Sequence, residues 1–108
     1  MTVAIARVTL VLAGAHSLKD KRMVLRRLKD LVKGKFNVSI AEVGENDIWQ
    51  RAIVGLTLVG NDRRFAESAL DQALRFVRDH AEVAKEEREL QTFGGEELSG
   101  EAFRHWEG

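Results

Sequence analysis

Hydrophobic and polar residues alternate along the first part of the chain. The even-numbered residues from Ala4 to Leu12 are all apolar, whereas Arg7 and Thr9 interrupt the odd-numbered set. A period of two is typical of a β-strand. The pattern along the chain predicts four strands, which are residues 2–12, 36–43, 49–59 and a segment within 83–93. The short turn at 44–47 indicates that the second and third strands form an antiparallel hairpin. The fourth strand is rich in Glu and Lys, which is typical of an edge strand.

Two segments between these strands have the 3.6-residue period of an amphipathic helix. The first is expected to begin after Ser17, a good N-cap residue, with Asp20 three positions on as in a capping box. It runs to about Lys33, and Gly34 is the expected C-cap.

The second helix is expected to begin after an N-cap at Asn61 or Asp62. Asp71 and Arg75 stand four residues apart, so they are expected to pair on its outer side. Its apolar half consists of Phe65, Ala69, Leu70, Ala73, Phe76 and Val77.

The order is therefore strand, helix, strand, strand, helix, strand. Because crossover connections are right-handed, both helices fall on one face of a four-stranded antiparallel sheet. This α+β fold is a ferredoxin-like sandwich (β-α-β-β-α-β). Residues 1–93 are expected to form this single domain, and 94–108 an acidic tail rich in Gly and Glu. In the tail, Phe103 and Trp106 either dock on the domain or a neighbour, or belong to a frayed segment.

This topology leaves one face of the sheet without helices. The third strand presents there either Ile53 and Val59 or its alternate residues, and both sets are largely apolar. A solvated face should be more polar. We therefore expect this face to be covered, most simply by a second copy in a homodimer.

Positive charge is concentrated on the first helix. Residues 16–35 contain eight Lys or Arg and two Asp or Glu, whereas residues 79–108 contain three and nine, although the whole chain has 17 of each sign. Cations recur there every three or four residues and share one helix face, opposite the apolar one, over about 21 Å. These cations are Lys19, Arg22, Arg26, Lys29 and Lys33. Such a row suits phosphate contact; the alternative is that both charge runs are solvated faces.

Three further residues are accessory candidates. Lys21 projects inside the apolar arc of the helix, so we expect its ammonium to snorkel to water; the alternative is an acidic partner or a bound anion. Trp49 and Arg51 are the other two, and Trp49 is expected in the core or in a dimer interface. The third strand has no aromatic residue at the positions that stack bases in the RNA-recognition fold, and no GXXG loop is visible, which favours backbone binding to structured RNA.

The sequence predicts no catalytic residue, cofactor or resident metal. The three histidines are scattered, and there is no Walker-type or dinucleotide-binding loop. Glu42, Glu45 and Asp47 surround one turn but lack the spacing of an EF-hand loop.

Composition narrows the class of protein further. Of 108 residues, 44% are hydrophobic, which is enough for one continuous core. The chain has no Cys, which excludes disulfides and thiolate ligands and suits a reducing cytoplasm. No apolar run approaches the roughly 18 residues that span a membrane, and the first residues do not have the pattern of a signal peptide. We expect a cytoplasmic protein without membrane contact.

Four motifs carry a family resemblance: HSLKDKR at 16–22, FNVSIAEV at 36–43, DIWQRA at 47–52 and GNDRR at 60–64. In this order, over about residues 1–95, the chain resembles the YlxP-like family of small bacterial proteins of unassigned function. The resemblance implies a ferredoxin-like fold and carries no catalytic residues. Genes of that family often lie beside genes for transcription elongation, translation initiation and a ribosome-binding factor, which implies a translation-related role by association.

Together these observations predict a non-enzymatic protein that binds structured RNA or a ribosomal particle through its first helix and forms a homodimer. The main alternative is a homodimeric protein–protein adaptor that uses its dimer and acidic tail. The third is an enzyme that depends on a metal or a small molecule.

Overall fold

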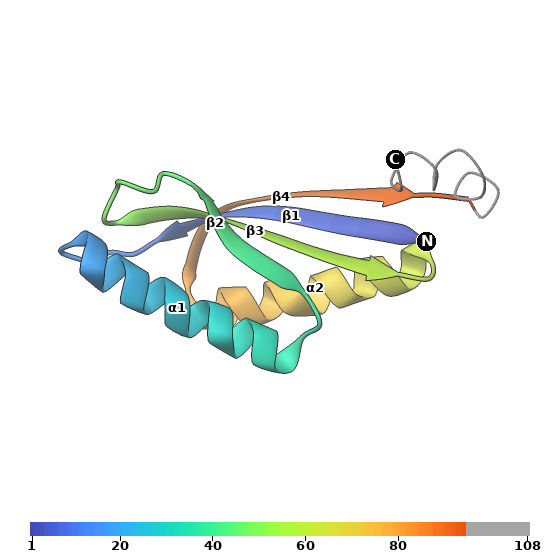
Figure 1. Ribbon diagram of the computed structural model, residues 1–108, viewed down its shortest axis with the longest axis horizontal. Coiled ribbons are helices and arrows are strands. Elements are labelled where there is room, and N and C mark those ends of the chain that lie inside the picture. Colours follow the sequence, from blue (N-terminus) through green and yellow to red (C-terminus); the bar gives the residue numbers. More distant parts are fainter. Residues whose placement is uncertain (95–108) are drawn as a thin grey trace, which may run out of the picture.

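Six elements follow the expected order in the computed structural model, which describes residues 1–94. They are β1 (Thr2–Val11), α1 (Leu18–Lys35), β2 (Ser39–Gly44), β3 (Arg51–Gly60), α2 (Arg63–His80) and β4 (Glu82–Thr92). The strands form one antiparallel sheet in the order β2-β3-β1-β4, and both helices lie on the same face of it (Figure 1). The predicted ferredoxin-like sandwich is therefore confirmed. Phe103 and Trp106 lie outside the described residues.

The core lies between the sheet and the two helices. Successive strand residues point to opposite faces. The inward apolar residues of β1 are at most 1% exposed, and they are Ala4, Ala6, Val8 and Leu10. The helices supply the facing layer, which consists of Leu25, Leu28, Val32, Ala66, Leu70, Ala73, Leu74 and Val77. Burial of each large aliphatic side chain contributes about 1.5–3 kcal/mol. The hydrophobic side chains thus hold both helices against one face of the sheet.

Polar side chains cap the start of both helices, as the sequence indicates. Ser17 Oγ accepts a hydrogen bond from the Asp20 backbone N–H (3.0 Å), and the Asp20 carboxylate accepts one from the His16 N–H (3.1 Å). Asp62 Oδ1 accepts a hydrogen bond from the Phe65 N–H at the start of α2 (2.8 Å). Ser17 and Asp62 each satisfy a backbone donor that the helix leaves free, and Asp20 satisfies one in the residue before the N-cap.

The predicted C-cap of α1 at Gly34 is wrong. The helix continues through Gly34 to Lys35, and Phe36 caps it by donating its N–H to the Val32 carbonyl (2.8 Å). The Phe36 ring packs edge-on against Phe76 of α2, with 5.5 Å between the ring centroids. This tertiary contact holds the residues after Gly34 in place. Gly34 therefore remains helical, and the packed side of α1 extends beyond it.

The packed side of α2 also differs from the prediction. Leu74 is buried, whereas Phe65 in the first turn is 57% exposed. Asp71 pairs with Arg88 of β4 and not with Arg75. Because β4 lies beside α2, it supplies a cation from a distant part of the sequence, which the spacing within one helix does not reveal.

The two strands of the hairpin begin later than predicted. β2 starts at Ser39 because residue 36 still belongs to the end of α1. β3 starts at Arg51 because the chain turns before it, with the Ile48 N–H donating to the Glu45 carbonyl (3.1 Å). Residues 45–50 are therefore a loop and not the beginning of a strand.

The sheet face without helices, here called the helix-free face, is partly apolar, as expected. It comprises the odd-numbered residues of β1 from Val3 to Val11 and the residues opposite them in the neighbouring strands. On this face Ile5 is 41% exposed and Val59 61%. Of the two sets that β3 offers, it is the one with Ile53 and Val59 that lies here. The described chain leaves this apolar surface in contact with solvent.

An ion pair between Arg7 and Glu87 joins β1 to β4 on the helix-free face. Arg7 Nε and Nη2 donate to the two carboxylate oxygens of Glu87, at 3.0 and 2.8 Å. These hydrogen bonds hold the pKa of Glu87 below its ordinary value of 4.5. Because the pKa is lower in the folded state, the pair stabilises the fold above pH 4.5, and this stabilisation is lost as the pH falls through the lowered pKa.

We therefore expect Glu87→Gln to make the melting temperature fall less steeply with acid than that of the wild type. The difference is small, because both side chains are about half exposed. Thermal melts between roughly pH 6 and pH 3 measure it. Glu89→Gln, which removes a carboxylate on the same face that has no cationic partner within residues 1–94, is the matched control. Parallel curves for the wild type and Glu87→Gln would contradict the prediction.

Candidate nucleic-acid interface

The cations predicted on the first helix all project from α1, although not directly opposite the core. Lys29 is half-buried and the others are exposed. The side of α1 that faces the sheet carries Leu25, Leu28 and Val32. At 100° per residue, Met23 points away from that side and is 61% exposed, so the cations occupy one flank of the helix. We call this set the basic row: Lys19, Arg22, Arg26, Lys29 and Lys33.

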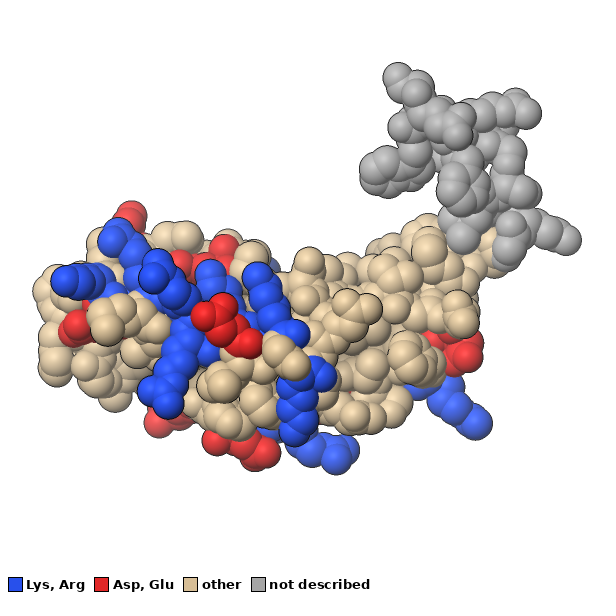
Figure 2. Space-filling model, turned by 60° about the horizontal axis from the view of Figure 1, so that its bottom comes forward, with Lys and Arg blue, Asp and Glu red and all other residues tan. Residues whose placement is uncertain are grey.

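The other flank of α1 faces α2. Val24 and Leu31, which the sequence assigns to the apolar face, lie on that flank and are 45% and 41% exposed. Lys35 lies there too, with its ammonium 5.0 Å from the centre of the Phe76 ring of α2. Lys35 stands about 160° from the centre of the basic row around the helix, so the row is turned away from α2. Figure 2 shows Lys and Arg side chains gathered over the α1 end of the molecule, with acidic side chains between them.

Within residues 1–94, none of the basic-row cations forms an ion pair, whereas cations of the other elements commonly do. The paired cations are Arg7, Lys21, Arg51, Arg78, Lys85 and Arg88. The fold thus supplies carboxylates to Lys21, to Arg78 of α2 and to several cations of the sheet, and leaves the row on α1 without them. Like charges held this close repel one another, and an external anion would relieve that repulsion.

Lys21, an accessory candidate, is buried and serves the fold. Its ammonium donates to the backbone carbonyls of Glu45 (2.6 Å) and Ile48 (2.7 Å) and lies 2.8 Å from Glu42 Oε2. The two carbonyls accept hydrogen bonds, and the Glu42 carboxylate balances the charge of the ammonium. The expected snorkelling to water is therefore wrong, and the alternative of an acidic partner is the one found. With 2% of its side chain exposed, Lys21 is not accessible to an external ligand.

The same contacts fix the loop between β2 and β3. Glu45 has a left-handed backbone (φ 56°), a conformation that costs a non-glycine residue about 1 kcal/mol or more. The bond from Lys21 to its carbonyl helps to offset that cost. Trp49 and Ile48 of this loop are 50% and 45% exposed, so the placement of Trp49 in the core is wrong. Arg51 is exposed and lies 3.1 Å from Glu45 Oε2.

The structure therefore brings the accessory residues to one end of the molecule but not into the basic row. Trp49 belongs to the loop that Lys21 ties to the first turns of α1, and Arg51 begins β3 directly after that loop (Figure 1). The row runs from that end along the flank of the helix.

Two of the three acidic residues at this turn have partners in the chain. Glu42 contacts Lys21, and Glu45 contacts Arg51. Within residues 1–94 no three His, Cys, Asp or Glu side chains are arranged to hold a metal ion. No helix in the same part of the chain combines the length and the apolar composition needed to cross a membrane.

Comparisons with known proteins identify a family. A family model described as "Protein of unknown function (DUF503)" matches residues 3–89. The Bacillus subtilis (strain 168) protein named "Uncharacterized protein YlxP" is 40% identical over 75 residues, which are 69% of this chain and 82% of that protein. Among solved structures, the de novo designed protein LFR1 1 with ferredoxin fold matches with a TM-score of 0.47 and 14% identity over 88% of each chain. The de novo designed protein Ferredog-Diesel matches with a TM-score of 0.42 and 13% identity over 85% of each.

Proposed function

We propose that this chain, which belongs to the DUF503 family, is a non-enzymatic protein that binds the phosphate backbone of structured RNA, free or in a ribosomal particle, through the basic row of α1. The observation that carries the proposal is that four of the five cations are exposed and that none of the five has an ion-pair partner within residues 1–94. A buried or internally paired row would not support it.

The spacing of the row suits a chain of phosphates. Neighbouring cations are three or four residues apart, which is about 4.5–6 Å along the helix axis. Two of the five are Arg, whose planar fork of donors matches phosphate geometry. Each contact neutralises one phosphate and releases counterions, so binding should weaken steeply with salt.

The side chains on the sheet favour contact with the RNA backbone over recognition of bases. The helix-free face carries no aromatic side chain within the described strands, so the sheet does not provide the stacking platform of RNA-recognition domains. Phosphate contacts position a protein but carry no sequence information. The gene neighbourhood of the YlxP-like family, which implies a role near translation, agrees with an RNA partner.

A protein–protein adaptor is the second candidate, and exposed apolar groups on α1 favour it. Met23 and Leu31 line a shallow groove of about 440 Å³ together with Arg26, Arg27 and Asp30. Apolar contact with a protein partner would depend little on salt, which separates the two functions experimentally.

The test compares two variants that each lose three exposed cations. One is Arg22→Gln, Arg26→Gln and Lys33→Gln in the basic row. The other is Arg63→Gln, Arg64→Gln and Arg75→Gln in α2, which are also exposed and without an ion pair within residues 1–94. Binding of the purified full chain to ribosomal RNA and ribosomal subunits is measured between roughly 50 and 200 mM salt.

For the wild type we expect the logarithm of the affinity to fall linearly with the logarithm of the salt concentration. The row variant should reduce the magnitude of the slope by about 2–3, since each lost phosphate contact removes about 0.7–0.9. The α2 variant should change it little. Absence of binding at low salt, or an equal loss in both variants, would overturn the proposal.

A further inference from the structure

The helix-free face exposes more apolar surface than a solvated sheet face should. Val43 and Val59 are 57% and 61% exposed, and Ile5 is 41% exposed. Val43 leans over Gly55 at the middle of the face, where an added Cβ would lie 3.2 Å from Val43 Cγ1. This surface belongs to β1, β2 and β3, so it is continuous across three neighbouring strands.

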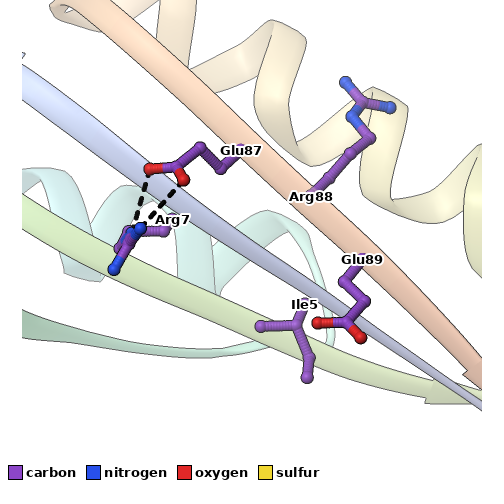
Figure 3. A pocket seen from close by; sticks show the side chains of 5 residues that line it. All are labelled: Ile5, Arg7, Glu87, Arg88 and Glu89. Carbon is purple, nitrogen blue, oxygen red and sulfur yellow. Dashed lines mark hydrogen bonds and ion pairs between the residues drawn. The ribbon is translucent and has the colours of Figure 1, made fainter.

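Within residues 1–94, the cations of the same face all have carboxylate partners in the same copy. Arg7 and Lys85 both contact the Glu87 carboxylate, and Arg51 contacts Glu45. Figure 3 shows Arg7 and Glu87 pointing toward each other, with Ile5 and Glu89 beside them and Arg88 pointing away. The face therefore differs from the basic row, because its cations do not need an external anion.

The layout of the face matches the anatomy of a protein interface. The apolar residues lie on β1, β2 and β3, while β4 contributes Lys85, Glu87 and Glu89 along one margin. Interfaces between proteins usually have an apolar centre and a polar rim. Three strands of 10, 10 and 11 residues and one of 6 make a face of roughly 600 Å². Two such faces bury about 1,200 Å² together, at the lower limit for a stable interface.

From these observations we infer that a second copy of this chain covers the helix-free face. In a two-fold dimer the same patch of each copy contacts the other. The apolar residues of one sheet then pack on those of the other, and the interface encloses no row of unpaired like charges. The Arg7–Glu87 pair enters the interface with both carboxylate oxygens already bonded. Because the helices lie on the other face of each sheet, the dimer carries its two basic rows on opposite outer sides. The inference stands on the sheet and does not depend on the proposed RNA binding.

Sedimentation velocity of the full chain tests the inference directly. One chain has a mass of 12.1 kDa, so we expect a species of about 24 kDa at tens of micromolar, in keeping with a two-fold dimer. Val43→Arg with Val59→Arg places two charges on the helix-free face at exposed positions and should give the mass of a single chain. Met23→Arg with Val24→Arg adds the same charges on the exposed side of α1, and this control should remain dimeric.

Far-UV circular dichroism and a cooperative melt establish that each variant is folded. Should the arginine pair fail to melt cooperatively, Ala41→Glu introduces a single charge at another exposed position of β2 on the same face. A wild type with the mass of one chain at these concentrations would overturn the inference, as would a folded helix-free-face variant that stays dimeric.

Discussion

Replacement of Lys21 by Met is expected to lower the free energy of unfolding by about 3–5 kcal/mol. The change removes a buried ammonium and leaves Glu42 and two backbone carbonyls without their donor. A carboxylate that is only partly exposed then lacks its counter-charge, and its desolvation is no longer offset. Urea unfolding followed by circular dichroism measures the loss.

The matched comparison is the double variant Lys21→Met with Glu42→Leu. Replacement of both partners of a buried pair by apolar residues is often nearly neutral, so the double variant should recover much of the lost stability. A double-mutant cycle then gives the coupling between the two residues. A single variant within about 1 kcal/mol of the wild type would show that the contact matters little.

Leu10→Ala is expected to cost about 2–5 kcal/mol. Leu10 is fully buried on β1, between β3 and β4 and beneath the helices, so the vacated space cannot be filled from solvent. At about 4–8 °C per kcal/mol for a domain of this size, the melting temperature should fall by about 10 °C or more.

The control makes the same substitution at Leu31, which is 41% exposed on α1. Alanine is a good helix former, so Leu31→Ala should change the stability by less than about 1 kcal/mol. Similar losses at both positions in calorimetry would contradict the assignment of the core.

The strands and the helix starts were predictable because their signals are local. Alternation along β1 places Val8 and Leu10 on one face without reference to any other strand, and the structure shows that this face is the buried one. The caps at Ser17 and Asp62 are equally local, since each accepts from a backbone N–H three residues on. Where the evidence for an element lies within a few residues, the sequence discloses it.

The errors concern contacts that join distant parts of the chain. Lys21 stands inside an apolar arc, and the sequence of α1 does not say whether its ammonium reaches water or a partner. The signal that would have helped is on β2, where Glu42 shares the inward side with buried Ile40. An inward carboxylate needs a cation, and the inward Lys21 is the natural one.

The basic row was likewise predictable in its local features but not in its tertiary contacts. Its five residues and their common flank follow from helical spacing, but whether other elements supply these residues with carboxylates depends on tertiary structure. Spacing alone does not distinguish them from Arg7, Arg78 or Arg88, which the fold supplies with carboxylates. The absence of such partners within residues 1–94 makes the row a candidate site.

The order of strands in the sheet also fixes when the protein can finish folding. β1 is synthesised first, yet its neighbours are β3 and β4, and Thr2 lies opposite Thr92. Pairings between residues so far apart in sequence form slowly, because a long loop must close before they gain any contact. Until residues 82–92 leave the ribosome, one edge of the apolar strand β1 stays open. A nascent chain that stops short of β4 therefore exposes a template for aggregation.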